Sequence, residues 1–169
     1  LNSASNGVVA EGSTGGGNGM ICYDFKGGTG TSSRQTEIKG KTYTVGTLVQ
    51  ANHGIRPWLN ILGKPVGRLI PHETLLAKET GSIIVIIATD APLSPLSLRQ
   101  VAKRAAIGVG RGGSPGGNSS GDIFLAFSVA KKKLMPQKDN IIIENNFLNS
   151  EYIDALYLAA VESVEEAVV

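Results

Sequence analysis

Two apolar segments of strand length constrain the fold of this 169-residue chain more than any other feature. Residues 82–88 are mostly Ile and Val, and residues 122–130 carry apolar side chains at both odd and even positions. Strands that are apolar on both faces are typical of a sheet that is covered on both sides. We therefore expect two central strands inside a layered structure.

The segments before these strands predict a small antiparallel unit and a long connection. Thr, Tyr and Val alternate between glycines in residues 20–25, 35–38 and 41–50, which indicates a meander of short strands. Residues 55–80 contain repeated Pro and Gly and cannot hold a long helix. We interpret that segment as a long connection that carries one short strand.

Two helices are predicted beside the strands. Ser94 followed by Pro95 fits a capped helix start, and apolar residues follow at helical spacing until Gly108 and Gly110, where we expect the helix to end. Residues 152–169 repeat apolar side chains on one helical face. The pattern favours an α+β fold with helices outside two packed sheets. Because the chain begins with Leu and stops inside this second helix, we expect the fold to be incomplete here.

Composition excludes several classes of protein. With 41% hydrophobic and 18% charged residues the chain should be soluble and globular, and residues 83–88 are too short an apolar run for a membrane span. A net charge of +2 does not predict a nucleic-acid partner, and the basic run Lys131 to Lys133 is interpreted as a solvated loop. Residues 1–6 lack the features of a signal peptide, so we expect a cytoplasmic protein.

The single cysteine limits redox and metal chemistry. Cys22 alone cannot form an intrachain disulfide framework or a cysteine-rich zinc site, and its apolar neighbours indicate an inert packed thiol. We therefore expect neither a metal nor a cofactor. His53 and His72 could be combined with Asp90 and a serine into a triad on paper, but no spacing supports it. Both histidines are interpreted as loop residues.

Glycine, at 22 of 169 residues, is well above its usual share of about 7% and produces several short motifs. Residues 108–113 match the spaced glycines of a dinucleotide-binding loop, and residues 117–121 match a nucleophile elbow centred on Ser119. Both motifs require a strand before the loop and a helix after it. Here the predicted order is reversed, so we reject both.

A different serine chemistry fits residues 117–121. A serine at the start of a buried strand, behind a flexible glycine loop, is suited to become an N-terminal nucleophile when the loop is cut. The freed α-amine, with a pKa near 8, can then act as the base for the hydroxyl of its own residue. The alternative is an ordinary serine-rich turn.

Five segments in order resemble the L-aminopeptidase/D-esterase family, the self-processing β-peptidyl aminopeptidases. They cover essentially the whole chain and are Gly-Gly-Gly-Asn-Gly-Met-Ile-Cys (15–22), Phe-Lys-Gly-Gly-Thr-Gly-Thr-Ser-Ser (25–33), Tyr-Thr-Val-Gly-Thr-Leu-Val-Gln-Ala-Asn-His-Gly (43–54), Ala-Thr-Asp-Ala-Pro-Leu (88–93) and Asn-Ser-Ser-Gly-Asp-Ile-Phe-Leu-Ala-Phe-Ser (118–128). The resemblance implies a four-layer α/β/β/α sandwich, of which residues 1–169 would be the central portion of a single domain.

The resemblance also implies autocleavage between Ser119 and Ser120. Residues 1–119 would then belong to an α-subunit and residues 120–169 to a β-subunit, with Ser120 as the nucleophile. Many relatives have Gly at the position of Ser119, which keeps the neighbouring serine as an alternative. The resemblance further implies a homo-oligomer, a tetramer.

Three further residues are assigned by the resemblance. Asn52 is expected to supply an oxyanion-hole donor, or else to be a turn residue before Gly54. Ser163 and Glu165 match the family's serine and glutamate near the nucleophile. On a regular helix, residues two positions apart are rotated by roughly 200° and cannot both point at one site. Either the turn is distorted, or the relevant carboxylate belongs to Glu162 or Glu166.

The expected activity is hydrolysis at an N-terminal residue. The substrate would be a small peptide, amide or ester, and the reaction would pass through an acyl-enzyme on Ser120. The alternatives are a processed acyltransferase, in which an amine accepts the acyl group, and an inactive structural fragment. Preference for L-, D- or β-amino acids is not encoded in these motifs.

Overall fold

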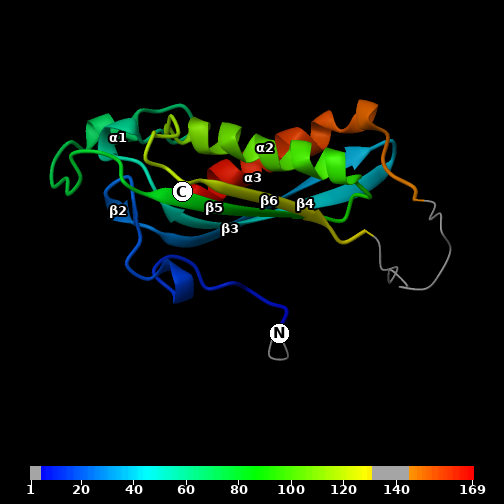
Figure 1. Ribbon diagram of the computed structural model, residues 1–169, viewed down its shortest axis with the longest axis horizontal. Helices are drawn as coiled ribbons and strands as arrows, with labels where there is room; N and C mark the ends of the chain where they lie inside the picture. Colours follow the sequence, from blue (N-terminus) through cyan, green and yellow to red (C-terminus); the bar gives the residue numbers. More distant parts are fainter. Residues whose placement is uncertain (1–4, 131–144) are drawn as a thin grey trace.

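The computed structural model describes residues 5–130 and 145–169, which form a four-stranded sheet with helices against it and a separate two-stranded sheet of β1 and β2 (Figure 1). The sheet has the order β3-β4-β5-β6, and the two long helices are α2 and α3. Their bounds are β3 (Gly28–Ile38), β4 (Lys41–Asn52), β5 (Ser82–Thr89), β6 (Ile123–Ser128), α2 (Pro95–Arg111) and α3 (Asp154–Val168). The shorter elements are η1 (Gly15–Gly17), β1 (Ile21–Cys22), β2 (Phe25–Lys26), η2 (Arg56–Trp58), α1 (Val66–Leu69) and η3 (Ser150–Tyr152).

A long hairpin forms one side of the sheet. Lys39 and Gly40, both at positive φ, make the two-residue turn between β3 and β4, and pairing continues from Ile38 opposite Lys41 to Gly28 opposite Ala51. Strand β5 is antiparallel to β4, whereas β6 runs parallel to β5. A parallel pair requires a crossover, which α2 provides. The predicted antiparallel pairing of residues 35–38 with 41–50 is therefore confirmed, although β3 begins at Gly28, whereas the segment 20–25 contributes to the separate sheet of β1 and β2 and does not join the meander.

Helices α2 and α3 lie side by side on one face of the sheet (Figure 1). Ser94 caps α2 as predicted, because its Oγ accepts the N–H of Ser97 at 3.1 Å. The prediction that Gly108 and Gly110 end the helix was wrong. Both lie within it, and a Cβ at Gly108 would come within 2.7 Å of the Val164 side chain. Gly108 is thus a place of close contact between the two helices.

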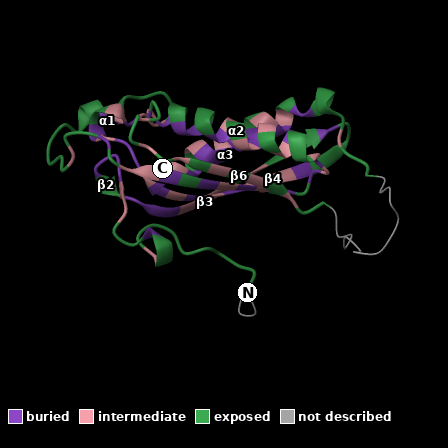
Figure 2. Cartoon of the chain, in the orientation of Figure 1, coloured by how far each residue is buried: buried purple, intermediate pink, exposed green. Residues whose placement is uncertain are grey.

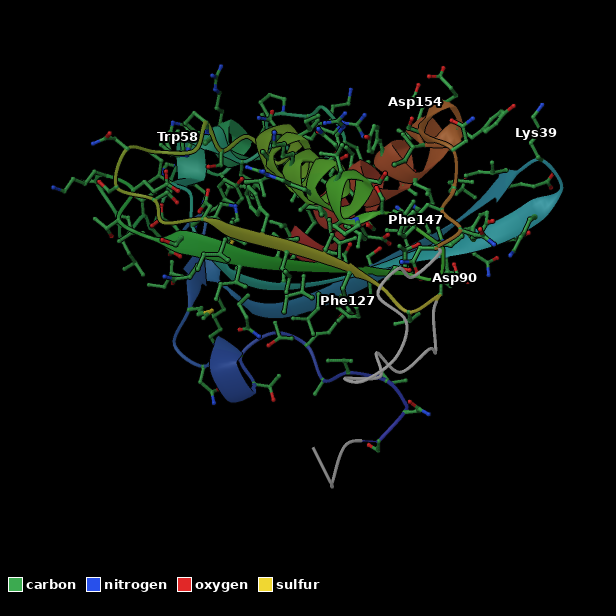
Figure 3. All side chains as sticks on the ribbon, turned by 45° about the vertical axis from the view of Figure 1, so that its right-hand side comes forward. Lys39, Trp58, Asp90, Phe127, Phe147 and Asp154 are labelled. Carbon is green, nitrogen blue, oxygen red and sulfur yellow. The ribbon has the colours of Figure 1, made fainter. Side chains whose placement is uncertain are left out.

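Strand β5 is buried on the helix side only, and β6 is no more than half-buried on either face. Ile83, Val85 and Ile87 of β5 are fully buried, whereas Ile84 is 42% exposed. Strand β6 is an edge strand of the described sheet, and its residues are exposed or half-buried (Figure 2). Phe127 points away from the helices (Figure 3). The expectation that both strands are covered on both faces is therefore not met by the described residues.

The mixed α/β fold and its incompleteness in this chain agree with expectation. Of the four layers expected, the described residues form one layer of helices and one of strands. The sheet face away from the helices exposes apolar side chains, and these residues are what led us to expect a second sheet against it. The short strand expected in residues 55–80 is replaced by η2, α1 and an isolated bridge between Ile61 and Lys64. No helix in the described ranges is long and apolar enough to cross a membrane. Lys131 to Lys133 lie outside the described residues.

Candidate active site

Three strands bring candidate residues together at one end of the sheet. Asn52, the last residue of β4, pairs with Ser82, the first residue of β5. Because β6 runs parallel to β5 with Ile123 opposite Ile84, the residues just before β6 lie beside the start of β5. The N–H of Gly121 donates to Ser82 Oγ at 2.8 Å. The fold therefore places Ser120 and Asn52 at the same end of the sheet.

Ser120 is held by two hydrogen bonds, one from its backbone N–H and one from its side-chain hydroxyl. Its N–H donates to the carbonyl oxygen of Gly117 at 2.8 Å, which closes a turn before it. Its Oγ donates to Asp122 Oδ1 at 2.5 Å, and the same carboxylate oxygen accepts the N–H of Ile83 at 3.1 Å. Ser120 is half-buried, while Ser119 is exposed. The expected cleavage site is thus a surface turn anchored to the sheet.

The loop before Ser120 rests on the buried carboxylate of Glu79. A Cβ at Gly117 would lie 2.4 Å from Glu79 Oε2, so a larger residue here would require the Glu79 carboxylate to shift. Glu79 Oε1 accepts the N–H of Gly54 at 2.6 Å, and Oε2 is buried without a hydrogen-bond partner in the described structure. Farther back, the carbonyl oxygen of Gly112 accepts the N–H of Asn60 at 2.9 Å.

The side-chain amide of Asn52 has one end fixed. Its Oδ1 accepts the N–H of Ile21 at 3.0 Å. Since a backbone N–H needs an acceptor, this bond turns the oxygen toward Ile21 and leaves the Nδ2 donors directed away from it. The half-buried amide therefore presents a neutral donor group at the strand end that also carries the Ser120 segment.

A buried group of titratable side chains lies next to Asn52. His53 is 2% exposed, its Nδ1 is 3.8 Å from Cys22 Sγ, and its ring meets that of Tyr23 edge to face. Burial lowers the pKa of His53 to about 4, opposed by the negative charge of Asp122. Burial raises the pKa of Cys22 to about 12. At neutral pH His53 and Cys22 are therefore uncharged, and they pack next to Asn52 as neutral side chains.

No Ser-His-Asp triad forms from the candidate residues. His53 follows β4 directly, as expected of a loop residue, but its Nε2 is buried without a partner in the described part of the chain. Asp90 lies at the other end of the sheet, where its Oδ1 accepts the N–H of Thr44 at 2.8 Å. Figure 3 shows Asp90 on the opposite side of the molecule from Trp58, which follows the Asn52 end of β4. His72 is exposed.

The structure does not bring Ser163 to Ser120. Ser163 is fully buried in α3, with its Oγ 2.7 Å from Thr47 Oγ1. Thr47 is five residues before Asn52 on β4, roughly 17 Å along an extended strand. Glu165 instead pairs with Arg111 at the end of α2, with 3.2 Å between Glu165 Oε2 and Arg111 Nη1. The two residues point in different directions, as helix geometry requires.

Carboxylates on the alternative positions of α3 also have partners elsewhere. Glu162 and Glu166 both contact Arg34 of β3, and Ser32 Oγ donates to Glu166 Oε2 at 2.5 Å. These contacts lower the pKa of Glu166, chiefly through the hydrogen bond from Ser32. No cluster of three or more His, Cys, Asp or Glu side chains suited to a metal occurs within residues 5–130 and 145–169.

Sequence reasoning missed the residues that anchor the Ser120 segment. Asp122 stands in the Ser-Gly-Asp motif, and an acidic residue two positions after a candidate nucleophile could have drawn attention to it. Ser82 and Glu79 gave no signal, because each acts across the sheet or from a long connection. Such contacts depend on strand pairing, which the sequence pattern does not specify.

The model of Peptidase family S58 matches residues 1–169, the whole chain. This chain belongs to that family. Beta-peptidyl aminopeptidase BapA of Sphingosinicella microcystinivorans is 45% identical over 183 residues, which cover 99% of this chain and 46% of that protein. The resemblance to the L-aminopeptidase/D-esterase family drawn from the five segments is therefore confirmed.

Solved structures agree with this S58 membership. The l-aminopeptidase d-ala-esterase/amidase of Ochrobactrum anthropi, described as a new variant among the Ntn hydrolase fold, matches with a TM-score of 0.91 and 53% identity over 97% of this chain and 45% of that one. A beta-aminopeptidase of Burkholderia sp. matches with a TM-score of 0.89 and 44% identity over 99% of this chain and 47% of that one. The chain spans a little under half the length of these relatives.

Proposed function

We propose that the S58 protein containing this chain is a self-processing serine aminopeptidase. It removes the N-terminal residue from small peptides, amides or esters through an acyl-enzyme on Ser120. The observation that carries the proposal is the placement of Ser120 just before β6. It lies in an anchored turn with an exposed residue before it, at the end of the sheet that also holds Asn52. The names of its relatives support an aminopeptidase activity.

In the proposed chemistry, cleavage between Ser119 and Ser120 frees the α-amine of Ser120. With an ordinary pKa near 8, this amine is partly neutral at physiological pH and accepts the hydroxyl proton of its own side chain. The alkoxide attacks the substrate carbonyl, and the Nδ2 donors of Asn52 stabilise the oxyanion. Water then releases the acyl group. Residues 1–119 and 120–169 belong to different subunits in this scheme.

We propose that Ser163 and Glu165 stabilise the fold and do not take part in the reaction. The buried Ser163 hydroxyl is already paired with Thr47, far along the sheet from Ser120, and Glu165 joins α3 to α2 through Arg111. Acyl transfer to an amine is the second candidate activity, because the same acyl-enzyme can react with either acceptor. The aminopeptidase names of the relatives favour water as the acceptor.

Paired substrates test the proposed activity in the full-length protein. Amino-acid p-nitroanilides with a free amino group are compared with the same compounds after N-acetylation. We expect release of nitroaniline from the free compounds only, and none from the Ser120→Ala variant. Equal hydrolysis of both series, or full activity in Ser120→Ala, would contradict the proposal. Excess amine nucleophile distinguishes acyl transfer, since it would yield amide products in place of the free acid.

A further inference from the structure

Self-cleavage and substrate hydrolysis cannot use the same base. Before cleavage the nitrogen of Ser120 is an amide, which has no basic lone pair to accept the hydroxyl proton. Another group must take that proton in the precursor. We propose that Asp122 is the catalytic base of self-cleavage, an inference that rests on the proposed processing at Ser120.

The contact between the two residues has the required direction. Ser120 Oγ donates to Asp122 Oδ1 at 2.5 Å, within the reach of direct proton transfer. The carboxylate is fixed, because the same oxygen accepts the N–H of Ile83 in β5 at 3.1 Å. The next residue is fixed as well, since the N–H of Gly121 donates to Ser82 Oγ. The serine is therefore aimed at its base before any cleavage has occurred.

The charge of Asp122 is not neutralised by a salt bridge. The ion pairs formed by the described residues join Arg34 and Arg111 to glutamates of α3, and none involves Asp122. No cation of the described residues therefore competes with Ser120 Oγ for this carboxylate. Asp122 is also half-buried, which strengthens its hydrogen bond with the serine relative to one in bulk water.

Other candidate bases are occupied or distant. His53 contacts Cys22 through Nδ1 and forms no hydrogen bond with Ser120, and its burial makes it a poor proton acceptor. Glu79 contacts Gly117 and holds the N–H of Gly54. Asp90 lies at the opposite end of the sheet on the N–H of Thr44. Asp122 is the carboxylate that the described structure places on the nucleophile.

The step balances without a further reactant. Asp122 takes the proton from Ser120 Oγ, and the oxygen attacks the carbonyl carbon of Ser119. The tetrahedral intermediate collapses as the carbon–nitrogen bond breaks, and the nitrogen of Ser120 receives the proton from Asp122. An ester between Ser119 and the Ser120 oxygen results. Water hydrolyses this ester to the Ser119 carboxylate and the free Ser120 hydroxyl, and the new amine then becomes available as a base.

Asp122→Asn separates this role from anchoring. The amide oxygen can still accept the N–H groups of Ile83 and of neighbouring donors, but the group cannot take up the proton. The matched control is Asp90→Asn, which alters another aspartate that accepts a backbone N–H from a neighbouring strand. In full-length protein, mass spectrometry follows the fragment that begins at Ser120. Because Asp122→Asn removes the general base, this fragment should appear about 10²-fold more slowly, or slower still, than in wild type. In Asp90→Asn it should appear at the wild-type rate.

A second background distinguishes a base from a mere anchor. A thiol, with a pKa near 8.5, needs less help from a base than a hydroxyl does. In the Ser120→Cys protein, adding Asp122→Asn should therefore slow cleavage by less than about tenfold. An equal slowing in both backgrounds would show an anchoring role and overturn the inference, as would Asp122→Asn that is cleaved at the wild-type rate. If wild-type protein itself stays uncut, the proposed processing fails, and this inference fails with it.

Discussion

Thr47 of β4 and Ser163 of α3 face each other in the core, with their hydroxyl oxygens 2.7 Å apart. Ser163 also donates to the carbonyl oxygen of Ala160 at 3.1 Å, so Thr47 acts as the donor in the pair. This contact joins the helical layer to the sheet through polar groups that water cannot reach. We infer from this contact that Ser163 has a structural role, which can be tested apart from any activity.

Ser163→Ala should lower the free energy of unfolding by about 1–3 kcal/mol, because it leaves the buried Thr47 hydroxyl without its acceptor. Urea unfolding measures the loss. Thr47→Val is the partner variant, and the double variant should cost less than the sum of the two single ones. A Ser163→Ala protein of unchanged stability but without aminopeptidase activity would show a catalytic role and contradict our assignment.

Asn52→Asp tests the oxyanion donor. The substituted carboxylate keeps an oxygen for the N–H of Ile21 but loses the Nδ2 donors and adds a negative charge. We expect turnover to fall by roughly 10² to 10³ or more with little change in KM. Asn60→Ala, which removes an amide that bonds the carbonyl oxygen of Trp58, is the control. Turnover within the range of that control in a folded Asn52→Asp protein would rule out the donor role.

His53 should make the protein less stable in acid. Burial lowers its pKa from 6.5 to about 4, so between these values the unfolded chain binds a proton that the folded chain does not. The associated stability is complete above pH 6.5 and decreases toward pH 4, by up to about 3 kcal/mol.

Urea unfolding across this pH range gives the measurement. His53→Phe keeps an aromatic ring against Tyr23 and removes the titration, so its stability should depend less on pH than that of wild type. His72→Gln alters the exposed histidine and is the matched control. The same pH slope in wild type and His53→Phe would show that His53 is not the group responsible.

Cys22 should be chemically inert in the folded protein. It is 7% exposed, and burial raises the pKa of its thiol to about 12, so almost no thiolate exists at pH 8. We expect no reaction with a disulfide reagent in buffer and rapid reaction in denaturant. The reaction is measured by the light absorption of the thiol that the reagent releases. Rapid modification of the native protein would contradict this packing.

Local patterns predicted most elements, whereas contacts between distant segments were less predictable. The Ser94 cap and the apolar face of residues 152–169 predicted α2 and α3 because both signals lie within one helix. Gly108 was misinterpreted because its role depends on Val164 of another helix, and a glycine that permits close packing looks the same in sequence as one that ends a helix.

The site shows the same division. The Ser-Gly-Asp motif and the Gln-Ala-Asn segment identified Ser120 and Asn52 as candidates, and strand pairing then placed them at one end of the sheet. The support from Ser82, Glu79 and Asp122 depends on register and on a loop crossing the sheet end, which periodicity cannot specify. The burial of His53 was likewise unpredictable, because Tyr23 and Cys22 cover it from a separate hairpin.

The mass of purified full-length protein tests the central claim most directly. Wild type should consist of two fragments, the second beginning at Ser120, and Ser120→Ala should remain a single chain because the attacking hydroxyl is absent. A second fragment beginning at Ser119 would move the nucleophile by one residue. An intact single chain that hydrolyses free amino-acid anilides would contradict the account, because Ser120 would then have no α-amine to serve as its base.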